Sequence, residues 1–174
     1  MLTVARIFIL LILVLSAGHS AVFGQTAEEI RYQEDYDRLQ EILKISDRAR
    51  QADQLVAYYK GRPNLDARLR VYADSKFGNA LNDLMKQPSL VKKLAQSALA
   101  VRPKFGEALF FYGVILKNES KFDEALMAFA KSSLIENSRQ TQAKQLLDTT
   151  YRGTHNGSIV GENKLIEKAK AEIK

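Results

Sequence analysis

The sequence predicts an all-α protein, and three observations support this class. Apolar residues recur at spacings of three and four along most segments after residue 25, which is the period of one helix face. Runs of alternating apolar and polar residues of strand length are hard to find. Only three prolines occur in 174 residues, and each lies where a turn between helices or a helix exit is expected.

The first predicted helix begins with a capping box. Thr26 and Glu29 are spaced so that each side chain can accept the free backbone N–H of the other residue. The apolar spacing that follows predicts helices over 26–47, 49–59, 65–84 and 90–98, two over 106–139, and one each over 138–151 and 162–174. We expect Asn64 to cap the third helix and Gly78 to weaken or kink its middle.

The segment 106–139 has the clearest internal pattern. Gly113 and Ala125 are small at positions where two helix backbones would cross closely, while Leu109 and Phe129 supply bulk beside them. A glycine inside a helix costs about 0.5–1 kcal/mol relative to alanine, so Gly113 needs a packing reason. The segment therefore predicts two short helices packed as a tight hairpin.

This pattern resembles the tetratricopeptide repeat, a helix–turn–helix unit that must stack on neighbouring units to bury its apolar face. Gly113, Ala125 and Phe129 match the family pattern outright. The departures from it are Tyr112, Leu116, Ser132 and Asn137. The resemblance is moderate over 89–105 and weak over 26–88. It implies an array of about three antiparallel helix pairs over residues 26–151, closed by a C-terminal capping helix.

Residues 1–24 have the layout of a signal peptide. A positive start at Arg6 precedes an apolar core over 7–15 and a small, weakly polar end. Cleavage after Gly24 fits the small residues at the recognised positions. The chain beyond this segment is therefore expected outside the cytoplasm.

Two alternatives stay open for this segment. Cleavage could also fall after Ala17 or Ala21, or the segment could be retained as an N-terminal membrane anchor through residues 7–23. The uninterrupted apolar run is shorter than the roughly 20 residues of a membrane-spanning helix, which favours removal. An extracytoplasmic chain without cysteine is most at home in a bacterial periplasm.

The sequence offers little for catalysis or cofactor binding. Without cysteine there is no thiolate metal site, and of the two histidines His19 falls in the leader and His155 in the Gly-rich loop 152–161. This loop neither follows a strand nor contains the lysine of a phosphate-binding loop. No nucleophile or carboxylate constellation stands out. We therefore expect a protein that is not an enzyme and binds no cofactor or metal.

The charge pattern disfavours nucleic acid as a partner. The net charge is +6, but 26 basic residues are interleaved with 20 acidic ones, and no run of five or six like charges occurs. Lysines also line the final helix. They are Lys164, Lys168, Lys170 and Lys174. We expect them to form a solvated face rather than a site for an anionic polymer or lipid.

The resemblance places a binding groove on the concave face that the first helices of successive pairs form. In the clear repeat this face holds Glu107, Phe110, Val114, Lys117 and Asn118. The subgroup that clamps a peptide's C-terminal carboxylate has lysine and asparagine at such places, so apolar Phe110 and Val114 disfavour a chaperone-tail receptor. An apolar, weakly basic groove suits a helix or an extended peptide. The alternative is that Phe110 and Phe111 only pack against the neighbouring pair.

The function that this resemblance implies is a non-enzymatic scaffold or adaptor that binds other proteins outside the cytoplasm. The alternative is a membrane-anchored accessory subunit of an envelope complex, if the N-terminal segment is retained. The two hypotheses differ in one covalent feature of the protein, its first residue.

We predict that the protein purified from its own host begins at Gln25. Intact-mass and N-terminal peptide mass spectrometry will give this residue directly. A chain that still begins at Met1 would contradict signal-peptide removal and support the anchored form.

Overall fold

The computed structural model describes residues 26–173, and these residues form eight helices and no strand. The predicted all-α class is confirmed for this part of the chain. The predicted signal segment, residues 1–24, lies outside it. Among the described helices none is long and apolar enough to cross a membrane. The chain divides into two units, one ending at Glu34 and one spanning Asp35–Lys174.

The described part of the first unit is the start of helix α2 (Ala27–Leu43). Its predicted capping box is present. The backbone N–H of Thr26 donates to Oε2 of Glu29 at 2.7 Å, and the N–H of Glu29 donates to Oγ1 of Thr26 at 3.2 Å. Each side chain thus satisfies a backbone donor that the first helical turn leaves free.

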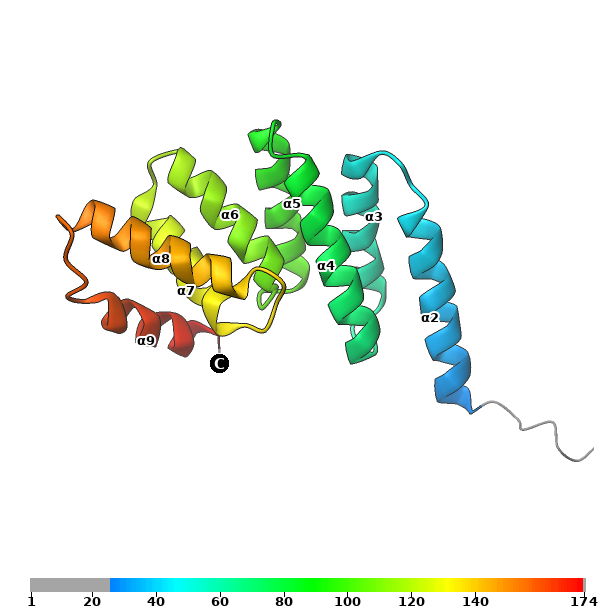
Figure 1. Cartoon of the computed structure of the whole chain (residues 1–174). Coiled ribbons are helices and arrows are strands. Elements are labelled where there is room, and N and C mark those ends of the chain that lie inside the picture. The colour runs from blue at the N-terminus through cyan, green and yellow to red at the C-terminus, as the bar shows by residue number, and fades with distance from the viewer. Residues whose placement is uncertain (1–25, 174) are drawn as a thin grey trace, which may run out of the picture. The chain divides into compact units, whose positions relative to one another are not determined.

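The second unit begins within α2 and contains all the later helices. These are α3 (Arg48–Gly61), α4 (Ala67–Asp83), α5 (Pro88–Val101), α6 (Gly106–Asn118), α7 (Phe122–Leu134), α8 (Gln140–Thr154) and α9 (Glu162–Glu172). Helix α3 packs against α4 and α5, α6 packs against α4, α5 and α7, and α7 also packs against α8 and α9 (Figure 1). From α3 onward each helix therefore contacts a next or next-but-one neighbour, as stacked helix pairs do.

Helices α6 and α7 cross closely at Gly113, as predicted. A Cβ atom built on Gly113 would lie 2.7 Å from Cε1 of Phe129 and 3.3 Å from Cβ of Ala128. Phe129 and Ala125 are fully buried in this crossing. The absence of a side chain at Gly113 thus lets the phenylalanine ring pack directly on the backbone of α6.

The end of this hairpin is held by polar contacts of small side chains. The buried hydroxyl of Ser132 donates to the carbonyl oxygen of Gly106 at 2.9 Å. The side-chain amide of Asn137 donates to the carbonyl oxygens of Ser132 at 2.8 Å and Ile135 at 2.7 Å. Asn137 therefore closes the exit turn, at the position where the sequence predicts one.

Helix α4 differs from expectation at its start. Its N-cap residue is Asp66 and not Asn64. The side chain of Asp66 accepts the N–H of Arg68 at 2.8 Å. The N–H of Leu65 bonds the carbonyl of Arg62 at 3.2 Å, so a turn occupies the residues before the helix. The helix then runs through Gly78 without interruption.

Helix α8 is longer than expected, because residues 152–154 are helical where the sequence predicts loop. The helix ends where the backbone turns left-handed, at Asn156 with φ 51° and Gly157 with φ 83°. The N–H of Gly157 reaches back to the carbonyl of Arg152 at 2.8 Å, which satisfies one of the last free carbonyls. The shorter loop leads to α9, which docks on α7 through buried Ala169.

A partly buried polar network joins three helices of the array. Nη1 and Nη2 of Arg102, just after α5, pair with the carboxylate of Asp74 on α4 at 2.6 and 2.9 Å. The hydroxyl of Tyr59 on α3 donates to the same carboxylate at 2.7 Å. Burial and then the Asp74 charge raise the pKa of Tyr59, so its proton stays available for this bond.

The preceding helix pair repeats this arrangement. Nε of Arg62, just after α3, donates to buried Asp35 on α2, and the hydroxyl of Tyr58 donates to the backbone carbonyl of Asp35 at 3.0 Å. Each pair thus has an acidic residue on its first helix and an arginine directly after its second. This recurrence relates α2–α3 to α4–α5, which the sequence pattern alone resolves only weakly.

We predict that Gly113→Ala lowers the free energy of unfolding by about 1–3 kcal/mol, as overpacking of a tight core contact does. The matched control is Gly153→Ala within α8, where an added Cβ meets nothing within 4 Å. This control should instead gain about 0.5–1 kcal/mol from helix propensity. Urea unfolding followed by circular dichroism measures both. Equal stabilisation by the two substitutions would show that the α6–α7 crossing is not tight.

Candidate functional site

A groove of about 550 Å³ lies between the end of α4, α6 and α8. Its apolar lining comes from Met85, Phe110, Phe111, Val114 and Leu146. Its polar lining comes from Asn82, Arg139, Gln142, Gln145 and Thr149. The volume is within the roughly 300–1,000 Å³ typical of ligand pockets. The groove therefore combines an apolar floor with neutral amide and hydroxyl groups and a single charged side chain.

The structure brings two of the five predicted site residues to this groove, Phe110 and Val114. Phe110 is only 8% exposed, and its ring lies 5.1 Å from that of Phe111 and 6.4 Å from that of Phe129. It serves the core as well as the groove floor. Val114 is half-buried and presents more of its surface to the groove.

The other three predicted residues are not part of the groove lining. Lys117 is half-buried and Asn118 exposed, both at the end of α6. Glu107 is 2% exposed, and its Oε1 accepts the N–H of Ser138 at 3.1 Å and the hydroxyl of Ser138 at 3.2 Å. Burial raises the pKa of Glu107. Its contacts tie α6 to the turn that precedes α8.

The contribution of α8 to the groove is not predicted by the sequence. The α8 residues that line the groove are exposed and polar: Gln142, Gln145 and Thr149. From the sequence alone they cannot be distinguished from an ordinary solvent-exposed helix face. Only the apolar face of α8, which packs on α7, has a spacing that the sequence pattern reveals. A polar groove wall has no periodic signature that separates it from ordinary surface.

A second hollow, of about 820 Å³, lies along α7 and α9. It is larger, and its lining includes both acidic and basic side chains. Nζ of Lys131 pairs with Oε2 of Glu172 at 2.6 Å across its edge. We favour the smaller groove as the candidate site, because its lining includes Phe110 and Val114, which the sequence predicts for the binding face.

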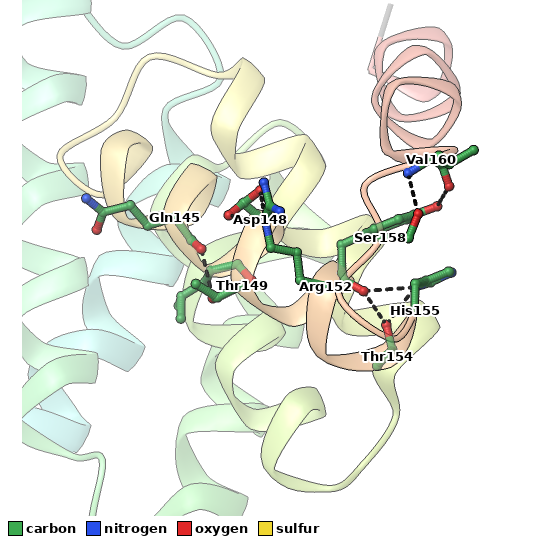
Figure 2. A network of polar contacts seen from close by, with 10 residues as sticks. Gln145, Asp148, Thr149, Arg152, Thr154, His155, Ser158 and Val160 are labelled. Atoms are coloured by element: carbon green, nitrogen blue, oxygen red, sulfur yellow. Dashed lines mark hydrogen bonds and ion pairs between the residues drawn. The ribbon is translucent and has the colours of Figure 1, made fainter.

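Polar contacts between neighbouring residues run along α8 from Gln145 and continue past its end to Val160 (Figure 2). Nδ1 of His155 lies 2.9 Å from the carbonyl oxygen of Tyr151 and 2.9 Å from Oγ1 of Thr154, and its ring stacks on Tyr151 at 3.9 Å. The N–H of Val160 donates to Oγ of Ser158 at 3.1 Å. In the part of the chain that is described, no group of acidic or histidine side chains could hold a metal ion.

The fold and the groove together define the class of this chain as an all-helical array with an open, largely apolar groove. Comparison with protein-family models, with curated proteins and with solved structures gives no match. The resemblance to the tetratricopeptide repeat thus rests on the residues of 106–139 and on nothing outside the chain.

We predict a pH-dependent effect of Glu107→Gln. A buried carboxyl with a raised pKa favours folding while protonated, and this stability is lost as pH rises from its unfolded pKa through its folded pKa. The glutamine has no charge to bury, and its Oε1 can still accept from Ser138. We expect the variant to be more stable than wild type at neutral pH, with the difference shrinking toward pH 4.

Thermal unfolding at a series of pH values measures this difference. The control is Glu41→Gln, which removes an exposed carboxylate paired with Lys44 and should show no such trend. A Glu107→Gln variant that is less stable than wild type at neutral pH would contradict the prediction.

Proposed function

We propose that this protein is a non-enzymatic scaffold or adaptor that acts outside the cytoplasm and binds other proteins through a tetratricopeptide-like groove. The observation that carries the proposal is the apolar groove between α4, α6 and α8. The N-terminal segment 1–24, with its signal-peptide layout, supports the location.

The groove has the properties of a protein-binding surface. Met85, Val114 and Leu146 are half-buried, so each keeps apolar surface in contact with water. Contiguous exposed apolar surface rimmed by polar groups is typical of interaction sites. The neutral amides of Gln142 and Gln145 on its rim are suited to the N–H and C=O groups of a bound peptide.

The resemblance to the tetratricopeptide repeat is a second argument for the groove as the binding surface. In the tetratricopeptide family the first helices of successive pairs line the concave face. The groove residues come from the end of α4, from α6 and from α8, which would be first helices in such an array. The segment 106–139, which carries the resemblance, contributes Phe110 and Val114 to the groove. Residues of close packing such as Gly113 serve the architecture instead.

We predict that Val114→Lys and Leu146→Lys each weaken partner binding by about tenfold or more, since a charge on the apolar floor removes about 1.4 kcal/mol or more of binding free energy. The matched control is Val71→Lys on α4, a valine that is 65% exposed and outside the groove lining. Phe110→Ala is a poor probe, because burial of the ring makes loss of stability the expected result.

The measurement has two steps. Crosslinking in the native envelope identifies the partner, and calorimetry with the purified partner then gives the affinity of each variant. Circular dichroism checks that helicity and melting temperature are retained. If the groove variants bind as well as wild type and as the Val71→Lys control, the groove is not the binding surface.

A further inference from the structure

The groove contains one charged side chain, Arg139, whose guanidinium has few partners within the chain. Its Nη1 donates to Oε1 of Gln142 at 3.2 Å. Its Nε is buried and has no hydrogen-bond acceptor among the described residues. The guanidinium carbon lies 5.7 Å from the centre of the Phe111 ring. Arginine has five donors in a rigid fork, so most of its capacity is unused here.

No acidic group of the groove offsets this charge. The lining contains asparagine, glutamine and threonine but no aspartate or glutamate. Glu107, an acidic residue of α6, accepts hydrogen bonds from the N–H and the hydroxyl of Ser138 at its Oε1. Some arginines of the array are paired, as Arg102 is with Asp74 and Arg152 with Asp148. Arg139 has no such carboxylate partner among the described residues, and it is the one arginine of the groove lining.

The surroundings strengthen the attraction of Arg139 for an anion. The ring of Phe111 and the burial of Nε reduce the screening of the guanidinium charge by water. Helix α8 begins directly after Arg139, and no acidic residue lies in its first turn. The positive end of the helix dipole therefore adds to the charge of the arginine.

We propose that the partner is a protein segment with an internal aspartate or glutamate that pairs with Arg139 while a large apolar side chain next to it enters the groove at Val114 and Leu146. This proposal rests on the proposed function and names the chemistry of its partner. Arg139 is the N-cap residue of α8 and lies seven residues before Leu146, which corresponds to about 10 Å of rise along the helix axis. The carboxylate and the apolar side chain of the partner must span a similar distance.

A side-chain carboxylate of a continuous segment fits this groove better than a chain terminus. The lining offers a single cation, whereas its amides at Asn82, Gln142 and Gln145 can pair with main-chain groups on both sides of the acidic residue. An arginine–carboxylate pair with two parallel hydrogen bonds supplies orientation as well as affinity. The apolar floor then supplies the contact area.

The experiment uses a random peptide library displayed within a loop, so that no peptide has a free terminal carboxylate. Peptides are selected for binding to the protein purified from its own host. We expect the selected peptides to share an acidic residue about 10 Å from a large apolar residue. Arg139→Gln should weaken their binding by about tenfold or more, as loss of a charged hydrogen-bonding partner does. Arg139→Glu should bind the same peptides again once their acid is replaced by lysine.

The matched control is Arg152→Gln, which removes an arginine of the same helix that lies outside the groove lining. It should leave binding unchanged, and circular dichroism will show that both variants keep their helices. Selected peptides without an acidic residue, or peptides that bind Arg139→Gln as well as wild type, would overturn the proposal.

The same selection separates this proposal from the proposed function. Selected peptides that lack an acidic residue but no longer bind the Val114→Lys variant would leave the groove as the binding surface. They would refute only the role of Arg139. Failure to select any peptide, or peptides insensitive to both Val114→Lys and Arg139→Gln, would refute both.

Discussion

The array depends on the carboxylate of Asp74, which holds three parts of the chain together. It accepts from Tyr59 of α3 and from Arg102 after α5, while Asp74 itself lies on α4. The guanidinium of Arg102 also lies 4.8 Å from the ring of Tyr59 and 4.5 Å from that of Phe105. A partly buried ion pair is stable only when its remaining donors and acceptors are satisfied, and loss of one partner leaves an uncompensated charge. This requirement fixes how α3, α4 and α5 pack.

The groove inherits its shape from this packing and from one further contact. The network sets the position of α4, against which α6 packs. Buried Glu107 on α6 then accepts two hydrogen bonds from Ser138, immediately before α8. Since Arg139 follows Ser138, the same contact that orders the turn also places the arginine at the end of the groove. Glu107, which the sequence predicts to face a partner, thus acts inside the protein. Arg139, which is not among the predicted site residues, lines the groove.

The chain separates its architectural residues from its binding residues by size and polarity. Gly113 permits close approach of α6 and α7, and a Cβ added there meets the ring of Phe129 and the methyl group of Ala128. Ala125 is fully buried on α7. Val114 and Leu146 are half-buried on the groove side, where a partner can complete their burial. Phe110 belongs to both sets, because one part of its ring packs in the core and the remainder forms the groove floor. This division explains why a large-to-small change at Phe110 would test stability more than binding.

The sequence by itself determined the helical class, the capping box at Thr26 and the tight crossing at Gly113, because these features depend on residues within one or two helical turns or within a single hairpin. The tertiary structure decided the rest. Asp74 and Arg102 are 28 residues apart, and Glu107 and Ser138 are 31 apart, so no local period links them. Asp66 rather than Asn64 caps α4 because the preceding turn delays the helix. The groove wall on α8 likewise exists only because three helices meet, and a polar helix face carries no sign of such a neighbour before the chain folds.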